Sequence, residues 1–314
     1  MDKAVLHDHL DGGLRGTTAL ELAKQASYKP LLNVKDINKF FDRSDCVSLE
    51  DYLEAFIHTT ALMNTYDNLE RIAFEAAEDM HNNGINLYES RYAPLYSVNS
   101  ELSIKSVLEA INSGFKQAES LYGIKSGLIL CGMRNDKNNV EKVGSIAIDY
   151  KQFIIGFDIA GPELNYRPSI FKETFNKVKD AGVNITIHAG EGDNVSSIKD
   201  AIDNGAQRIG HGVRIIEDID VESKVMGNTA EFILNNQIPL EICITSNIHT
   251  NMYKDYINHP VKELIDFGFN VTINTDNRLM SNTDIKKELV HCNKIGIKNP
   301  EELLVKSARY SFMN

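Results

Sequence analysis

Short apolar runs alternate with amphipathic stretches along almost the whole chain. The runs are rich in β-branched residues and end at small or polar residues, which is the pattern of buried strands. The stretches between them repeat their apolar residues every three or four positions, as helices packed on one face do. Eight strands are expected, at residues 4–9, 85–92, 125–131, 153–158, 183–188, 206–211, 239–245 and 270–275.

Helices are expected between these strands, and several of them stop at a glycine. They lie at 103–122, near 140–150, in a segment ending at Gly182, before Gly205, near 220–236, in a segment ending at Gly268, and in two terminal segments, the last beginning at Pro300. Two more helices are expected before the second strand, because apolar residues recur at helical spacing over 49–63 and again over 69–80. An earlier helix is expected to open with a capping box at Thr18 and Glu21, and residues 29–47 look irregular.

The regular alternation predicts a single domain over residues 1–314. No linker rich in Pro, Gly or Ser divides it, so a single (β/α)8 TIM barrel is expected, with additional helices after the first strand and at the C-terminus. The active site of such a barrel lies at the C-terminal ends of its strands. A doubly wound sheet is the alternative, but the chain has no Gly-x-Gly-x-x-Gly motif or phosphate loop to support it.

Composition excludes several classes of protein. The chain is 42% hydrophobic and 25% charged, as soluble globular proteins are, and its formal net charge of -11 argues against nucleic acid as a partner. Four widely spaced cysteines contain no Cys-x-x-Cys pair, which indicates reduced thiols. Without a recognisable signal peptide or membrane span, we expect a cytoplasmic protein with no membrane partner. The oligomeric state is left open.

Five of the expected strands end in polar side chains that could share one site. They end at His7-Asp8-His9, Asp158-Ile159-Ala160-Gly161, His188-Ala189-Gly190-Glu191, His211-Gly212 and Asp276-Asn277. A barrel would bring these ends together around one mouth.

The histidines and the aspartate form a plausible metal site. His7 and His9 are two apart on a strand, so their side chains point to the same side. Together with His188 and Asp276 they offer nitrogen and oxygen donors that suit Zn²⁺ and leave a position for water. His211 could be a fourth ligand, or it could orient a metal-bound hydroxide.

Glu191 follows His188 by three residues and could carry protons beside the metal if its pKa is raised. The alternative is a rim carboxylate that caps the next helix, which is expected to begin at Asn194. The remaining histidines, including His259, lie away from the strand ends and are expected to be structural or solvated. The acidic segment 217–222 is expected to be a solvated turn.

These motifs resemble the adenosine deaminase family. The resemblance rests on Leu6-His7-Asp8-His9-Leu10-Asp11-Gly12, His188-Ala189-Gly190-Glu191, Arg208-Ile209-Gly210-His211-Gly212 and Asn274-Thr275-Asp276, and it runs nearly end to end. It implies one Zn²⁺ per chain, held by His7, His9, His188 and Asp276. It also implies that Glu191 exchanges a proton with purine N1 and that His211 orients the zinc-bound hydroxide.

The resemblance further implies which residues bind substrate. Gly161 would offer its amide to purine N3, Asp11 would contact a ribose hydroxyl, and His9 would border the substrate. The family commonly has two adjacent aspartates where this chain has Asp276-Asn277. The Asn277 amide could donate directly to purine N7, whereas a carboxyl must first carry a proton.

The reaction implied is hydrolytic deamination of adenosine and 2'-deoxyadenosine, with water as the second substrate, in purine salvage. Adenine deamination is the alternative. A two-metal amide or phosphate hydrolase is a rival, but the fourth strand ends in Phe157-Asp158 without the lysine that often bridges two metals. A purine-binding protein without catalysis is another rival, although all the expected ligands and Glu191 are present.

Overall fold

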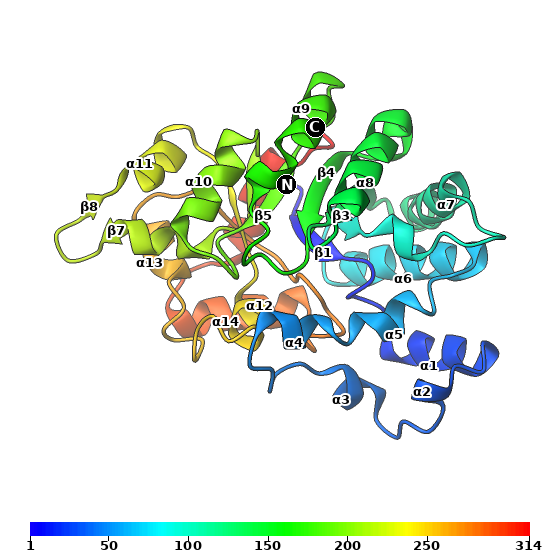
Figure 1. Cartoon of the computed structure of the whole chain (residues 1–314). Coiled ribbons are helices and arrows are strands. Elements are labelled where there is room, and N and C mark those ends of the chain that lie inside the picture. The colour runs from blue at the N-terminus through cyan, green and yellow to red at the C-terminus, as the bar shows by residue number, and fades with distance from the viewer.

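The computed structural model describes all residues, 1–314, and at its centre parallel strands form a barrel (Figure 1), built from two four-stranded sheets. One four-stranded sheet has the order β1-β2-β3-β4 and the other β10-β9-β6-β5. The strands are β1 (Ala4–His9), β2 (Leu87–Tyr92), β3 (Lys125–Met133), β4 (Gly156–Ala160), β5 (Thr186–Ala189), β6 (Arg208–His211), β9 (Leu240–Ile242) and β10 (Val271–Ile273). All eight expected strands are therefore present, in the expected order.

The two sheets meet at two seams, where isolated bridges replace continuous ladders. At one seam Asp8 is bridged to Asp276, and the backbone N–H of His9 donates to the carbonyl oxygen of Asp276. At the other, Phe157 is bridged to Ile185. The first seam joins the first and last strands, so two expected ligand segments become neighbours.

Helices surround the strands (Figure 1). They are α1 (Gly16–Gln25), α2 (Lys29–Leu32), α3 (Ile37–Phe41), α4 (Leu49–Leu53), α5 (Phe56–Thr60), α6 (Tyr66–Asn82), α7 (Ile104–Tyr122), α8 (Lys137–Asp149), α9 (Lys172–Asp180), α10 (Val195–Asp203), α11 (Asn228–Asn235), α12 (Ile244–His249), α13 (Val261–Asp266), α14 (Ile285–Ile295) and α15 (Glu301–Ser307). Helices α1 to α6 follow the first strand and α14 and α15 close the chain, as expected for the additional helices.

The strands are almost entirely buried, because helices cover their outer sides and side chains fill the barrel. The interior is not purely apolar. Buried Arg91 pairs with Asp158 and Glu241, and buried Arg208 pairs with Glu241 and Glu89. These charges alternate in sign, which offsets the cost of removing each one from water.

Two local expectations are wrong. The first half of the helix expected near 220–236 is a hairpin of β7 (Ile219–Asp220) and β8 (Val225–Met226), because Asp220 accepts the backbone N–H groups of the turn and stops a helix there. The capping box is also absent. Thr18 donates instead to Glu75, and Glu21 pairs with Arg71, so contacts with α6 take both side chains.

Other expected boundaries need adjustment. The seventh strand ends at Ile242, because the chain turns into α12 two residues later. Residues 29–47, expected to be irregular, contain the short helices α2 and α3. The acidic segment 217–222, expected to be a solvated turn, is a turn only at residues 221–222: Glu217 and Asp218 end a 3₁₀ helix, and Ile219–Asp220 form β7. Asp218 also accepts backbone N–H groups at the start of α11.

The two ends of the chain pack together at one end of the barrel (Figure 1). Tyr310 and Met313 pack against Ala4 and Leu6. None of the helices combines the length and apolar character needed to span a membrane. All four cysteines are free, and three of them are buried.

Candidate active site

A cavity of about 660 Å³ opens at the C-terminal ends of the strands. Eight of the nine predicted site residues line it, namely His9, Asp11, Gly161, His188, Glu191, His211, Asp276 and Asn277. The ninth, His7, lies deeper and is fully buried. The barrel thus brings together residues that are up to 270 positions apart in the sequence, as the strand ends predicted.

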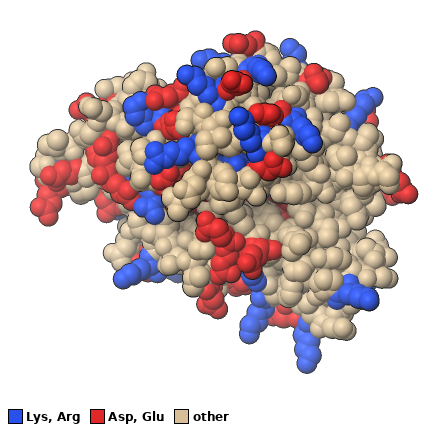
Figure 2. All heavy atoms as spheres, in the orientation of Figure 1, with Lys and Arg blue, Asp and Glu red and all other residues tan.

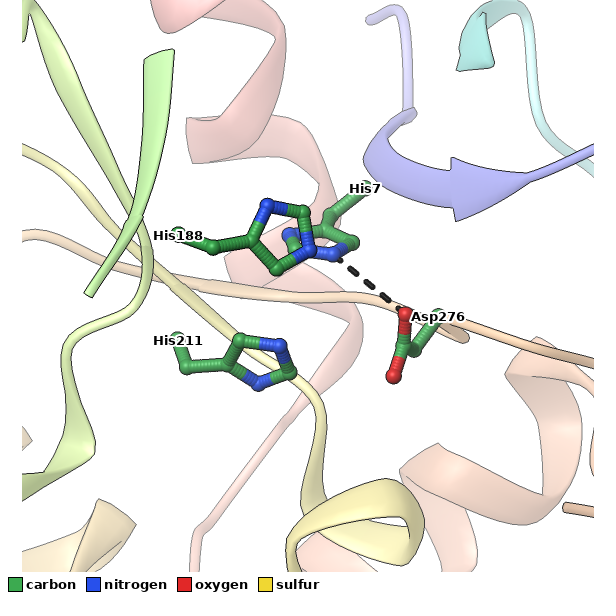
Figure 3. Close-up of side chains that lie close together, drawn as sticks. All are labelled: His7, His188, His211 and Asp276. Carbon is green, nitrogen blue, oxygen red and sulfur yellow. Dashed lines mark ion pairs between the residues drawn. The ribbon is translucent and has the colours of Figure 1, made fainter. Parts of the chain in front are cut away.

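Four side chains converge on one point in the floor of this cavity (Figure 3). Each of His7, His188, His211 and Asp276 places a donor atom within 4.8 Å of the others. His9 joins them, because its Nε2 lies 3.2 Å from Nε2 of His188 and 3.4 Å from Oδ1 of Asp276.

The cluster fits a metal ion better than it fits a set of internal hydrogen bonds. Nε2 of His7 is buried and has no hydrogen-bond partner, although it faces Oδ1 of Asp276 at 3.4 Å. An unpaired buried nitrogen is costly unless something else occupies its lone pair. Imidazole nitrogens and one carboxylate are the donors that Zn²⁺ and similar divalent ions take.

Two of these residues have a backbone conformation that side chains rarely adopt. His211 and Asp276 have φ angles of 60° and 55°, in the left-handed region. Such residues are kept where the surrounding structure enforces them, most often at functional sites. Here the turn at the end of each strand directs the side chain toward the cluster.

Buried carboxylates form hydrogen bonds with two of the histidine rings, on the side of each ring that faces away from the cluster. Oε2 of Glu241 lies 3.1 Å from Nδ1 of His7, and Oδ2 of Asp158 lies 2.8 Å from Nδ1 of His188. Each carboxylate accepts the Nδ1 proton, so the Nε2 lone pair faces the cluster. Arg91 bridges the two carboxylates. Despite burial, the pKa of Asp158 is lowered by His188 and Arg91, and that of Glu241 by Arg91 and Arg208.

The sequence patterns do not predict these supporting groups. Asp158 ends an expected strand but is given no role there, and neither Glu241 nor Arg91 is singled out. For Asp158 and Glu241 the available signal is a charged residue in the middle of an otherwise apolar strand, which is expensive to bury unless it is paired.

Glu191 is buried beside the cluster. Burial raises the pKa of this carboxyl well above its usual range, and the nearby carboxylates of Asp276 and Glu163 raise it further. The group is therefore suited to hold a proton at neutral pH. The alternative role, capping the next helix, belongs to Asn194, whose side chain accepts the backbone N–H of Ser196 at 3.0 Å.

Glu163 holds the loop that carries Glu191. Its carboxylate accepts the backbone N–H groups of four consecutive residues, Gly190 to Asp193, at 2.7 to 3.1 Å. Sequence analysis gave Glu163 no role, since only the fold brings it beside this loop.

His211 faces Glu191 on one side and α12 on the other. Its Nε2 lies 3.5 Å from Oε2 of Glu191, and its Nδ1 lies 3.0 Å from the Asn247 side-chain amide. Burial lowers the pKa of His211 well below its usual value, so the ring is neutral.

The remaining predicted residues line the walls. Burial raises the pKa of Asp11 to about 7, and its Oδ1 has no hydrogen-bond partner, although Nδ1 of His9 lies 3.9 Å away. Oδ1 of Asn277 is likewise buried and unpaired. Gly161 has a φ of 96°, and a side chain there would come within 3.2 Å of Met133. All three positions present polar backbone or side-chain groups to the cavity.

Helices α4 and α5 cover one side of the cavity with apolar side chains. These are Leu49, Tyr52, Leu53, Phe56 and Ile57. The helical spacing had indicated these residues as core, and the fold makes them a cavity wall as well. No lysine or arginine lines the cavity. Figure 2 shows acidic side chains gathered over α4, which carries exposed Glu50 and is followed by exposed Glu54.

A (β/α)8 barrel with a buried His and Asp donor set and a protonated carboxyl at its C-terminal mouth is the arrangement of a metal-dependent hydrolase. Comparison with known proteins agrees. The family model for adenosine deaminase matches residues 2–313. The protein named adenosine deaminase 1 of Streptomyces coelicolor is 40% identical over 302 residues, which cover 92% of this chain and 76% of that protein. The chain belongs to the adenosine deaminase family.

Solved structures show the same fold. Adenine deaminase from Arthrobacter aurescens superposes with a TM-score of 0.89 at 22% identity, covering 99% of this chain and 93% of that one. A zinc-bound amidohydrolase from Burkholderia ambifaria superposes with a TM-score of 0.85 at 20% identity, covering 100% of this chain and 86% of that one.

Proposed function

We propose that this protein hydrolyses adenosine and 2'-deoxyadenosine to inosine or deoxyinosine and ammonia. The observation that carries the proposal is the placement of buried Glu191, whose pKa burial raises, beside the His and Asp cluster in one cavity. Similarity to a relative named adenosine deaminase, at 40% identity over 92% of this chain, supports the substrate.

His7, His9, His188 and Asp276 would hold one Zn²⁺. The donor set, the unpaired Nε2 of His7 and the carboxylates behind two of the rings support this assignment. An amidohydrolase of the same fold has been solved with bound Zn²⁺. When bound, Zn²⁺ supplies water at a pKa near neutrality.

The protein's own groups would bind and polarise the purine. Glu191 would hold its proton for purine N1, since protonation there makes C6 electrophilic. His211 would orient the attacking oxygen, because its Nε2 faces the same space as the Glu191 carboxyl.

Asp11, Gly161 and Asn277 would place the substrate. The Asp11 carboxyl is free to meet a ribose hydroxyl, and the Gly161 amide would donate to purine N3. The Asn277 amide would donate to purine N7. Their positions in the cavity wall support these roles.

The cavity's charge favours nucleosides over nucleotides. Its lining contains Asp11, Glu54, Glu191 and Asp276 but no lysine or arginine, and acidic side chains lie over α4 beside it. A phosphate would find no cationic partner in this lining. We therefore expect AMP to be a poor substrate.

Adenine is the alternative substrate, since the Arthrobacter aurescens structure of similar fold is an adenine deaminase. The unpaired buried Oδ1 of Asp11 favours a substrate that brings its own hydroxyl donor.

A parallel assay tests the proposal. Purified, zinc-loaded protein is offered adenosine, 2'-deoxyadenosine, adenine and AMP, and ammonia release is measured together with the ultraviolet change from 6-amino to 6-oxo purine. We expect turnover of both nucleosides, and loss of turnover after chelation that returns with Zn²⁺. Turnover of adenine alone would favour the alternative, and turnover of none would contradict the deaminase proposal.

A further inference from the structure

A chain of three buried side chains leads from His211 away from the cavity. Nδ1 of His211 lies 3.0 Å from Nδ2 of Asn247, and Oδ1 of Asn247 lies 3.2 Å from Nε2 of His259. All three residues are buried, with exposed fractions of 1%, 0% and 0%. Asn247 lies in α12, and His259 lies two residues before the start of α13.

The far end of this chain fixes the direction of every hydrogen bond in it. The backbone N–H of Val261, in the first turn of α13, donates to Nδ1 of His259 at 3.3 Å. A backbone amide can only donate, so Nδ1 of His259 must accept. In a neutral ring the proton must then sit on Nε2. Burial lowers the pKa of His259 to about 3, which keeps this ring neutral.

The remaining assignments follow in order. Because Nε2 of His259 carries the proton, it donates to Asn247, which must present its oxygen to that ring. The Asn247 NH₂ group therefore faces His211 and donates to Nδ1. Because Nδ1 of His211 accepts this hydrogen bond, it carries no proton, and the proton of the ring is on Nε2, the nitrogen that faces Oε2 of Glu191.

We propose that Asn247 and His259 are positioning residues that hold His211 as the Nε2-protonated tautomer. His211 is then a hydrogen-bond donor into the cavity and has no lone pair to offer a metal from that nitrogen. This separates His211 from the four proposed ligands, although its ring lies among them. The catalytic consequence rests on the proposed deaminase function, whereas the tautomer itself does not.

The substitution Asn247→Asp tests the direction of the chain. It replaces the NH₂ donor with a carboxylate acceptor of the same shape, which favours the proton on Nδ1 of His211 and exposes the Nε2 lone pair to the cavity. The tautomer is read from the imidazole ¹⁵N signals of the zinc-loaded protein, with His211→Gln identifying the His211 signals. We expect Nε2 to be protonated in the wild type and Nδ1 to be protonated in Asn247→Asp.

Kinetics and metal content accompany the spectra. We expect Asn247→Asp to lower kcat by about 100-fold, in the range of a lost proton-handling group. We expect KM to change by no more than a few fold, with one Zn²⁺ per chain retained. A purely structural defect would lower metal content and thermal stability as well.

A second pair of variants tests the His259 end of this hydrogen-bonded series. His259→Leu removes the donor and frees the Asn247 amide to turn over, whereas His259→Gln retains an N–H donor. We expect the first to lose the single His211 tautomer and most of kcat, and the second to recover both in large part. His291→Leu is the matched control, because that histidine stacks on Tyr256 and takes no part in the hydrogen bonds between His211, Asn247 and His259.

The outcomes separate this proposal from the proposed function. A wild-type His211 protonated on Nδ1 would overturn it, and so would Asn247→Asp or His259→Leu with unchanged His211 signals. If no purine is deaminated but the tautomer follows these expectations, the positioning role stands and only the proposed reaction fails.

Discussion

Oδ2 of Asp158 lies 2.8 Å from Nδ1 of His188, and Oδ1 of the same carboxylate accepts the backbone N–H of His188 at 3.1 Å. One buried side chain thus holds both the ring and the main chain of an expected metal ligand. Arg91 donates to the same carboxylate, and this charge helps to lower the pKa of Asp158. The site is therefore organised by groups that do not themselves reach the cavity.

Asp158→Asn should weaken metal binding. The amide is neutral and places an N–H₂ group where Arg91 and His188 both need an acceptor. Loss of such an orienting partner typically costs about 10- to 100-fold in metal affinity. Competition with a chelator of known affinity measures the change. Asp149→Asn, at an exposed position at the end of α8, should bind the metal like the wild type; equal affinity in Asp158→Asn would contradict the orienting role.

Glu191→Gln should abolish most activity while leaving the metal in place. The amide has the size of the carboxyl but cannot transfer a proton to the purine. We expect kcat to fall by about 10²- to 10⁴-fold, the usual contribution of general acid catalysis. Steady-state kinetics and zinc analysis are measured on the same preparation. Glu54→Gln is the control at an exposed part of the cavity lining. If deaminase activity survives in Glu191→Gln, Glu191 is not the proton donor.

Asn277→Asp should change KM and its pH dependence more than kcat. The amide of Asn277 can donate to purine N7 at any pH, whereas a carboxyl can donate only while it is protonated. We expect KM of the variant to rise with pH above the pKa of the new carboxyl, and wild-type KM to lack this rise. The measurement is kcat and KM across a pH series. Identical profiles for the two proteins would count against a role at N7.

Glu288→Gln should make the fold more stable in alkaline solution. Glu288 is buried in α14, and burial raises its pKa from 4.5 to about 7, while hydrogen bonds from Thr245 and Thr283 oppose the shift. The folded state holds this proton more tightly than the unfolded chain. The group therefore stabilises the fold fully below pH 4.5, and this contribution is lost as pH rises through about 7.

The shift corresponds to about 3 kcal/mol at most. Between pH 5 and 8, the wild-type free energy of unfolding should fall by up to that amount relative to Glu288→Gln. Denaturant unfolding at several pH values measures it. Glu302→Gln, at an exposed position, should follow the wild type. Parallel pH curves for the wild type and Glu288→Gln would show that Glu288 ionises normally.

Much of the barrel could be predicted because its signals are local. A buried strand needs a short apolar run, and a helix packed on one side needs an apolar repeat of three or four residues, so both can be recognised within a dozen positions. One error, the expected capping box, occurred where a distant contact overruled a local pattern. Thr18 has the sequence of a helix cap, but Glu75 on another helix takes its hydroxyl.

The sequence by itself determined which donors exist and which end of the barrel they reach. His7, His188, Glu191 and Asp276 each follow an apolar run, and parallel strands in a barrel present such ends to one mouth. That reasoning needs only the chain order and the direction of each strand.

Only the tertiary structure decided how each ring is held. The hydrogen-bond partners of Nδ1 in His7, His188 and His211 are Glu241, Asp158 and Asn247. They lie 234, 30 and 36 residues away in the sequence. Hydrogen bonds act over about 3 Å, so the partner of a ring depends on which strand or helix lies beside it. No local sequence pattern indicates which residue that partner is. The partner nevertheless determines whether a histidine presents a lone pair or a proton to the cavity.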